Sequence, residues 1–317
     1  MLDVVTLGEA MIRLATPVGE ALESASSLEL RVAGSEANVA IIVARMGFRA
    51  GWISKLPDDP LGRRIAAEVR RHGVDISRVV WVSQGRTGLY FIERVPTPRS
   101  VTVYYDRAGS ACAALTPEEV DWAYVRSARW VHVTGITPAL SPSCAAVVVR
   151  MLEEARSSGI PTSLDINYRR KLWSPERARE TLEPLFGMVH ILIVAQEDAR
   201  EMLCLDGDAA EIASRLWAQW RLKAAIVTAG PQGAYLSDHN GMHHEPALQA
   251  VEVDPIGRGD AFAAGVLWGA LEGDVRVGLR YGVALAAIAQ ATRGDIPWCT
   301  RQDVLQILTG GKSRPRR

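Results

Sequence analysis

One stretch of the sequence decides the fold: Val251-Glu-Val-Asp-Pro-Ile-Gly-Arg-Gly-Asp-Ala-Phe-Ala-Ala-Gly265. The pattern predicts a strand that ends at Val253, a turn flanked by glycines, and a helix that opens at Asp260. Successive backbone N–H groups at a helix N-terminus form a binding site for anions. We therefore expect the backbone of residues 257–260 to bind a phosphate-like group.

Asp260 lies where this loop enters the predicted helix. A carboxylate there can take the proton from an alcohol that attacks phosphorus. The loop is not a Walker A motif, because no Gly-Lys-Ser/Thr follows it. The alternative is an Asp that caps a helix after a glycine turn, which is common in α/β proteins. On these residues alone, both interpretations stay open.

Short apolar runs on both sides of this stretch are typical of buried parallel strands, and segments with helical periodicity separate them. The alternation predicts an α/β fold with an open, mostly parallel sheet and helices on both faces. The predicted strands are Val4–Leu7, Ala50–Ser54, Trp130–Thr134, Thr162–Asp165, Ile191–Val194 and Ala225–Thr228. The predicted helices are Asn38–Met46, Gly62–His72, Ser143–Ser157, Pro175–Leu185, Asp198–Leu203, Asp208–Trp220 and Asp260–Leu271.

Two stretches, residues 11–32 and 86–107, break the alternation and have the pattern of extended, amphipathic chain. The second contains a hairpin signal, with Pro96–Arg99 joining two alternating segments. We expect a small inserted β-sheet that forms a lid over a site at the carboxyl ends of the parallel strands. The prediction is a single domain over residues 1–310, followed by a disordered basic tail over 311–317.

Composition excludes several classes of partner. Of 317 residues, 48% are hydrophobic, and Lys+Arg and Asp+Glu balance at 36 each. No bulk charge would draw the chain to nucleic acid or to an anionic membrane. The four cysteines have no metal-binding or redox spacing, and the N-terminus lacks the features of a signal peptide. We expect a cytoplasmic protein with reduced thiols that binds neither nucleic acid nor membrane.

Two segments together resemble the signatures of ribokinase-like (PfkB) carbohydrate kinases. Asp254-Pro-Ile-Gly-Arg-Gly-Asp260 resembles the C-terminal signature Asp-Thr/Pro-x-Gly-Ala-Gly-Asp. Ala33-Gly-Ser-Glu-Ala-Asn-Val-Ala40 resembles the N-terminal signature Gly-Gly-x-x-x-Asn-x-Ala. The resemblance extends from Thr6 to Asp295. It implies a ribokinase-like fold with a β-lid, ATP and Mg²⁺ as cofactors, a homo-oligomer formed through the lid, and a monovalent cation near Asp254.

Within that family the chain looks most like the 2-keto-3-deoxygluconate kinases, which implies phosphorylation of this sugar acid to its 6-phosphate. The supporting segments are Thr87–Tyr90, Tyr104–Ala111, Thr134–Pro142 and Leu164–Pro175. Two alternatives remain open. One is another kinase of the same fold that acts on fructose, ribose or a nucleoside, and the other is a catalytically impaired homologue that binds a sugar acid.

The resemblance assigns roles residue by residue. It implies Asp260 as the base, with an anion hole formed by Gly257, Arg258 and Gly259. It implies substrate contacts from Glu9, Gly34, Asn38, Tyr90 and Tyr105, and a grip on the substrate carboxylate from Arg107 and Arg169. It implies nucleotide contacts from Asp198, Thr228, Gly230 and Gly233 together with Gly257 and Gly259, and Mg²⁺ held by Asp198 through water.

Structural alternatives stand beside these roles. The two tyrosines could pack the lid, and Arg107 could be a solvated charge at a sheet edge. Arg169 could pair with Asp165, and Asn38 could cap a helix.

The sequence departs from the family on the nucleotide side. Asp198 stands where relatives have Glu, and Ala195 where they have Asn. Thr228 stands where Lys is common, and Arg258 replaces a small Ala. Asp198 can still hold a hydrated Mg²⁺, and the Arg258 guanidinium could add a cation beside the transferred phosphate. The opposite outcome is that the long side chain fills the phosphate space.

Overall fold

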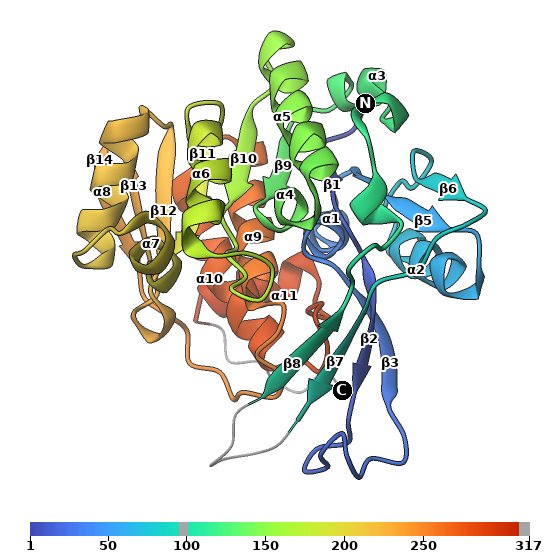
Figure 1. The fold of residues 1–317 in the computed structure, drawn as a ribbon. Helices are drawn as coiled ribbons and strands as arrows, with labels where there is room; N and C mark the ends of the chain where they lie inside the picture. Colours follow the sequence, from blue (N-terminus) through green and yellow to red (C-terminus); the bar gives the residue numbers. More distant parts are fainter. Residues whose placement is uncertain (95–100, 311–317) are drawn as a thin grey trace.

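The computed structural model describes residues 1–94 and 101–310 (Figure 1). Its largest sheet has eight strands in the order β14-β13-β12-β11-β10-β9-β1-β4. Six strands run parallel, and β13 and β14 form an antiparallel hairpin at one edge. The predicted α/β class with a mostly parallel sheet is therefore confirmed. The strands are β1 (Val4–Leu7), β4 (Ala50–Ile53), β9 (Val131–Thr134), β10 (Thr162–Asp165), β11 (Ile191–Ala195), β12 (Ala224–Thr228), β13 (Ala234–Asp238) and β14 (Gly241–Glu245).

Helices cover both faces of this sheet because successive strand residues point to opposite sides. In β11, Ile191 and Ile193 pack into one hydrophobic core, and Leu192 and Val194 pack into the other. The first core is shared with α1 (Ser35–Arg45), α2 (Pro60–Arg71), α9 (Arg258–Glu272), α10 (Val275–Gln290) and α11 (Arg301–Leu308). The second is covered by α3 (Trp122–Arg126), α5 (Pro142–Ser157), α6 (Pro175–Phe186), α7 (Gln196–Leu203) and α8 (Ala209–Trp220), and α4 (Ile136–Leu140) adjoins it.

A second sheet of four strands, the lid, projects from the large sheet (Figure 1). Its order is β3-β2-β7-β8, with β2 and β7 parallel and the other pairs antiparallel. The strands are β2 (Met11–Ala15), β3 (Glu29–Ala33), β7 (Leu89–Glu93) and β8 (Thr102–Asp106). The extended pairing of 86–107 matches the predicted hairpin, and its predicted turn at Pro96–Arg99 lies outside the described residues, as does the predicted tail.

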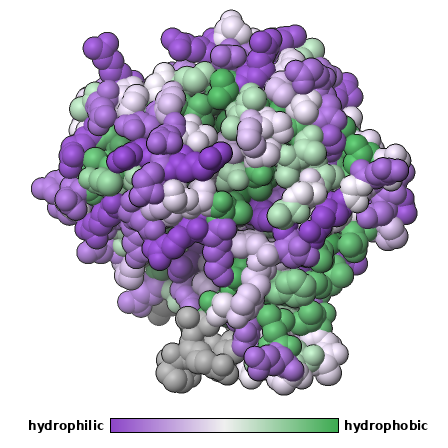
Figure 2. All heavy atoms as spheres, in the orientation of Figure 1, coloured by the Kyte–Doolittle hydropathy of each residue, from purple (hydrophilic) through white to green (hydrophobic). Residues whose placement is uncertain are grey.

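Hydrophobic residues gather over the lid at the lower right of Figure 2, whereas the rest of this face is mixed and largely hydrophilic. The expected homo-oligomer through the lid stays a prediction. None of the described helices is long and apolar enough to cross a membrane.

One sequence prediction is wrong. No strand ends at Val253, because residues 246–257 form a loop without regular pairing. Val251 and Val253 are 79% and 51% exposed, so their alternation with Glu252 faces solvent and not a sheet. The predicted helix start at Asp260 is also two residues late, and the start at Asn38 is three residues late.

Several smaller elements carried no clear signal in the sequence. The third sheet pairs β5 (Lys55–Pro57) with β6 (Val80–Val82). The 3₁₀ turns are η1 (Cys112–Ala114), η2 (Pro117–Glu119) and η3 (Gly230–Gln232).

Candidate active site

A cleft of about 500 Å³ lies between the lid and the carboxyl ends of the parallel strands. Most of the sequence-predicted site residues line it. They are Glu9, Gly34, Asn38, Tyr90, Tyr105, Arg107, Arg169, Asp198, Thr228, Gly257, Arg258, Gly259 and Asp260. Gly230 and Gly233 are not among the lining residues and lie in and just after η3, the turn that follows β12. Carboxyl ends of parallel strands are the usual place for ligand sites in open α/β sheets.

Asp260 is the third residue of α9 and is held by side chains from another helix. The Ser35 hydroxyl donates to its Oδ1 at 2.6 Å, and the Asn38 amide donates to its Oδ2 at 2.7 Å. Burial raises the pKa of the Asp260 carboxyl to about 6, although these two donors favour the charged form and lower it. Asp260 is not a helix cap, because Gly257 occupies the cap position.

α1 delivers the two donors because its N-terminus approaches the backbone of the first strand–lid connection closely. A Cβ added at Gly34 would come 2.2 Å from the Glu9 carbonyl oxygen. Gly34 is the N-cap of α1, so Asn38 lies inside the helix and does not cap it. Asn167 continues the network by donating from Nδ2 to the Ser35 hydroxyl at 3.0 Å.

The glycine loop before Asp260 has the geometry of an anion site. The Ala261 N–H bonds to the Gly257 carbonyl, so the N–H groups of residues 258–260 have no partner within the helix. Gly257 has φ +89°, and a Cβ there would come 2.2 Å from the Asp295 carbonyl oxygen. A Cβ at Gly259 would meet nothing within 4 Å, so space lies open in front of the loop.

The Arg258 side chain lies against Gln290 and Glu252. Its guanidinium donates to the Gln290 side chain at 3.4 Å and lies 3.8 Å from the Glu252 carboxylate. The side chain is 47% exposed. In this position it leaves the space in front of Gly259 free.

Among the carboxylates that line the cleft are Asp165, Asp198 and Asp260. Burial, and next the charge of Asp260, raise the pKa of Asp165 to about 8. Burial raises the pKa of Asp198 to about 6, and its Oδ2 accepts the Tyr168 N–H at 3.2 Å. Buried carboxylates whose charged form is disfavoured by desolvation are a favourable place for a cation.

No ready-made metal cage of three or more acidic, histidine or cysteine side chains occurs within residues 1–94 and 101–310. The oxygen donors of Asp198 nevertheless suit Mg²⁺, which usually keeps several waters and takes only one or two protein carboxylates. The donor set therefore fits a hydrated Mg²⁺.

On the lid side, Arg107 and Glu9 form a buried ion pair. Arg107 Nε donates to Glu9 Oε2 at 2.7 Å, and the guanidinium lies 5.5 Å from the centre of the Tyr105 ring. Arg107 is therefore not a solvated edge charge. Glu9 Oε1 is buried and accepts no hydrogen bond from the described part of the chain, so it can accept one from a ligand hydroxyl.

Arg169 is exposed at the rim of the cleft. Its side chain makes no hydrogen bond or ion pair with any described residue, so the alternative of a structural pair with Asp165 is wrong. Its charge acts on the three carboxylates and lowers the pKa of each. The guanidinium is thus available to an anionic ligand.

Sequence reasoning missed several residues that the fold brings to this cleft, namely Ser35, Asp165, Asn167 and Asp295. Asp165 and Asn167 carried a usable signal, because they sit at and just after the carboxyl end of a predicted strand. Ser35 directly follows Gly34 in the N-terminal signature. Asp295 carried none, because its partners are distant in sequence.

Comparison with known proteins gives consistent matches. The family model "pfkB family carbohydrate kinase" matches residues 1–301. The 2-dehydro-3-deoxygalactonokinase of Haloferax volcanii is 43% identical over 98% of this chain and 97% of its own length. The 2-dehydro-3-deoxygluconokinase of Thermoproteus tenax is 35% identical over 93% of this chain and 90% of its own. The crystal structure of the 2-dehydro-3-deoxygluconokinase of Thermotoga maritima superposes with a TM-score of 0.93 at 29% identity, covering 98% of both chains.

Proposed function

The chain belongs to the pfkB family of carbohydrate kinases and is a sugar kinase, and we propose that it phosphorylates a 2-dehydro-3-deoxy sugar acid at its terminal hydroxyl. The primary candidate is 2-keto-3-deoxygluconate, which is the same compound as 2-dehydro-3-deoxygluconate, and the product would be its 6-phosphate. The observation that carries the proposal is the Asp260 carboxylate, held by Ser35 and Asn38 beside an open anion loop.

Asp260 would act as the general base. With a pKa near 6, its carboxylate is ionised at neutral pH and can accept the proton of a substrate hydroxyl. The two donors fix the carboxylate at the point where α9 begins. The unpaired N–H groups of residues 258–260 would stabilise charge on the transferred phosphoryl oxygens.

MgATP would supply the phosphoryl group and its neutralising cation. Asp198 would hold the hydrated metal, and Thr228, at the end of β12, would border the nucleotide together with the turn at Gly230 and Gly233. Arg258, bound to Gln290, leaves the phosphate space open, which supports an active enzyme over an impaired one.

An acidic substrate is supported by Arg169, the exposed guanidinium at the rim of the cleft. A planar fork of N–H donors binds a carboxylate in two places. Glu9 Oε1 would accept a hydrogen bond from a substrate hydroxyl. The Tyr105 hydroxyl would donate to a substrate hydroxyl or accept from one. Arg107 would support the substrate through its pair with Glu9 as well as by direct contact.

The test is an ADP-release assay with ATP and Mg²⁺ over the gluconate and galactonate forms of the keto-deoxy acid, which differ at C4, and over fructose, ribose and a nucleoside. We expect turnover of at least one keto-deoxy acid, with kcat/KM well above that for the neutral sugars. No turnover of either acid would refute the proposed substrate class.

A neutral sugar is the second candidate, and the Glu9–Arg107 pair is the observation that favours it, because one of the two cationic side chains is already neutralised. Arg169→Ala separates the candidates. Loss of a carboxylate partner should raise KM for the acid by about 10- to 100-fold. The matched control is Arg170→Ala, whose exposed guanidinium pairs with Glu201, and it should leave KM unchanged. An Arg169→Ala enzyme with unchanged KM would favour the neutral sugar.

A further inference from the structure

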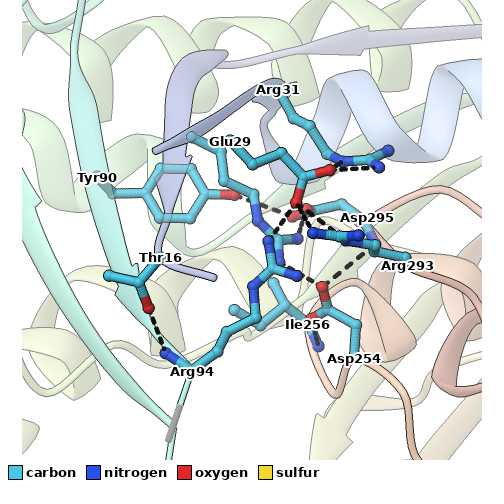
Figure 3. A network of polar contacts seen from close by, with 11 residues as sticks. Thr16, Glu29, Arg31, Tyr90, Arg94, Asp254, Ile256, Arg293 and Asp295 are labelled. Atoms are coloured by element: carbon cyan, nitrogen blue, oxygen red, sulfur yellow. Dashed lines mark hydrogen bonds and ion pairs between the residues drawn. The ribbon is translucent and has the colours of Figure 1, made fainter. Parts of the chain in front are cut away.

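Arg13 is a fully buried arginine on lid strand β2, and it pairs with two carboxylates outside the lid. Its Nη2 binds Asp254 Oδ2 and its Nη1 binds Asp295 Oδ1. Tyr90, from the neighbouring lid strand β7, donates its hydroxyl to Asp295 Oδ2 at 3.1 Å. Figure 3 shows Tyr90, Asp254 and Asp295 converging on this point.

These two carboxylates support the anion loop directly. Asp254 accepts the Ile256 N–H at 3.3 Å and the Gly294 N–H at 3.2 Å, so it fastens the first residues of the loop to the chain before Asp295. Gly257 packs against the Asp295 backbone so closely that a Cβ would come 2.2 Å from its carbonyl oxygen. A shift of Asp254 or of the Asp295 backbone would therefore displace the backbone of the anion loop.

The resemblance to the kinase family implied a monovalent cation near Asp254. This position does not fit one, because the guanidinium already provides the positive charge between Asp254 and Asp295. A second cation beside a buried guanidinium would meet like-charge repulsion in a medium that screens it poorly. The expected cation site and the observed arginine are therefore in disagreement.

We propose that Arg13 is a built-in replacement for a monovalent cation, a positioning residue that fixes the anion loop through Asp254 and Asp295 and makes phosphoryl transfer independent of K⁺ and Na⁺. This inference rests on the proposed function for its kinetic readout. The Arg13 guanidinium also ties the anion loop to the lid, since Arg13 belongs to β2.

The first test uses the unmodified enzyme. Initial rates are measured with saturating MgATP and keto-deoxy acid in KCl, NaCl and choline chloride at equal ionic strength. The three rates should agree within about twofold. Activation by K⁺ or Na⁺ of about tenfold or more over choline would overturn the proposal.

The second test removes the guanidinium. Arg13→Ala should lose about 10²-fold in kcat with a smaller change in KM, because the loop is misplaced by a residue remote from the reacting atoms. The vacated site should then accept an external cation, so K⁺ should restore the Arg13→Ala rate by about tenfold over choline. The matched control is Arg31→Ala, which removes the residue facing Arg13 on β3, and its rate should not respond to K⁺.

Arg13→Lys keeps a positive charge and should remain independent of K⁺. A folded Arg13→Ala enzyme with the kcat of the unmodified protein, or with no response to K⁺, would contradict the assignment.

A thermal melting experiment measures cation binding at the Arg13 position without relying on catalysis. Replacing choline with K⁺ should leave the Tm of the unmodified protein unchanged but raise the Tm of Arg13→Ala, since an ion that binds only the folded state stabilises it. If no sugar is turned over, the proposed function fails while this comparison still decides the role of Arg13. If Arg13→Ala does not fold, the K⁺ response of the unmodified enzyme decides it.

Discussion

At the scale of single residues, the environment of Asp260 sets both the direction and the proton affinity of its carboxylate. Both oxygens accept hydrogen bonds from α1, which leaves each oxygen a further lone pair for the cleft. Burial disfavours the charged form of the carboxylate, whereas the hydrogen bonds from Ser35 and Asn38 stabilise that form. The result is a carboxylate that is mostly ionised at pH 7 yet retains affinity for a proton, as the proposed role of a base requires.

The pH dependence of the reaction follows from this balance. The pKa of Asp260 is raised to about 6, so kcat/KM should fall as the pH falls through about 6 and the base becomes protonated. The apparent value belongs to Asp260 coupled to its acidic neighbours in the cleft. A pH–rate profile with a stable substrate checks this, and a profile that stays flat down to the ordinary value of 3.8 would contradict it.

Ser35 offers a finer test. Removing its hydroxyl in Ser35→Ala takes away a hydrogen bond to the charged form of Asp260, so the acid limb of kcat/KM should move to higher pH. Ser54→Ala removes another buried hydroxyl, which faces Cys112, and should leave the limb in place. An unshifted limb in Ser35→Ala, with normal folding, would separate Ser35 from the acidity of Asp260.

At the scale of elements, the site is built where the N-termini of α1 and α9 meet. Each helix has a glycine at its N-cap position, without a side-chain cap, because the backbone of another segment lies where a Cβ would be. This close packing brings the donors of α1 within hydrogen-bonding distance of Asp260. The two family signatures in the sequence therefore contact each other in the fold, through α1 and α9.

Gly257→Ala tests this contact. Its φ of +89° is costly for alanine, and its Cβ would collide with the Asp295 backbone, so we expect a loss of about 1–3 kcal/mol in the free energy of unfolding. Urea unfolding checks the loss. The control for stability is Gly259→Ala, whose Cβ would enter open space, and it should unfold within about 0.5 kcal/mol of the unmodified protein. Equal stability of the two variants would contradict the close packing.

At the scale of the whole molecule, the sequence predicted what depends on local pattern or on the two motifs. Short continuous apolar runs located the parallel strands, which are buried on both faces, and Asp260 and Asn38 were found through their motifs. The Val251–Val253 alternation misled because a solvent-facing loop can alternate as a strand does. The Arg13 cluster was invisible, since its partners Asp254 and Asp295 lie 241 and 282 residues away along the chain. Only the closed fold brings such residues together.

The burial of Asp165, and next the charge of Asp260, should lower the stability of the ligand-free protein at higher pH. The folded-state pKa of Asp165 is raised from 3.8 to about 8, so the stability from its neutral form is full below 3.8 and is lost as the pH rises to about 8. Asp165→Asn should therefore raise the Tm relative to the unmodified protein at pH 8 more than at acid pH. A Tm difference that does not depend on pH would contradict the raised pKa of Asp165 in the folded protein.

The most direct test of the central claim is the turnover number of Asp260→Asn with the preferred keto-deoxy acid. The amide fits the same contacts, since its oxygen can accept from Asn38 and its nitrogen can donate to Ser35 Oγ. Loss of a general base should lower kcat by about 10²- to 10⁴-fold, with KM and Tm close to those of the unmodified enzyme. An Asp260→Asn enzyme that keeps kcat within about tenfold would contradict the assignment of Asp260 as the base.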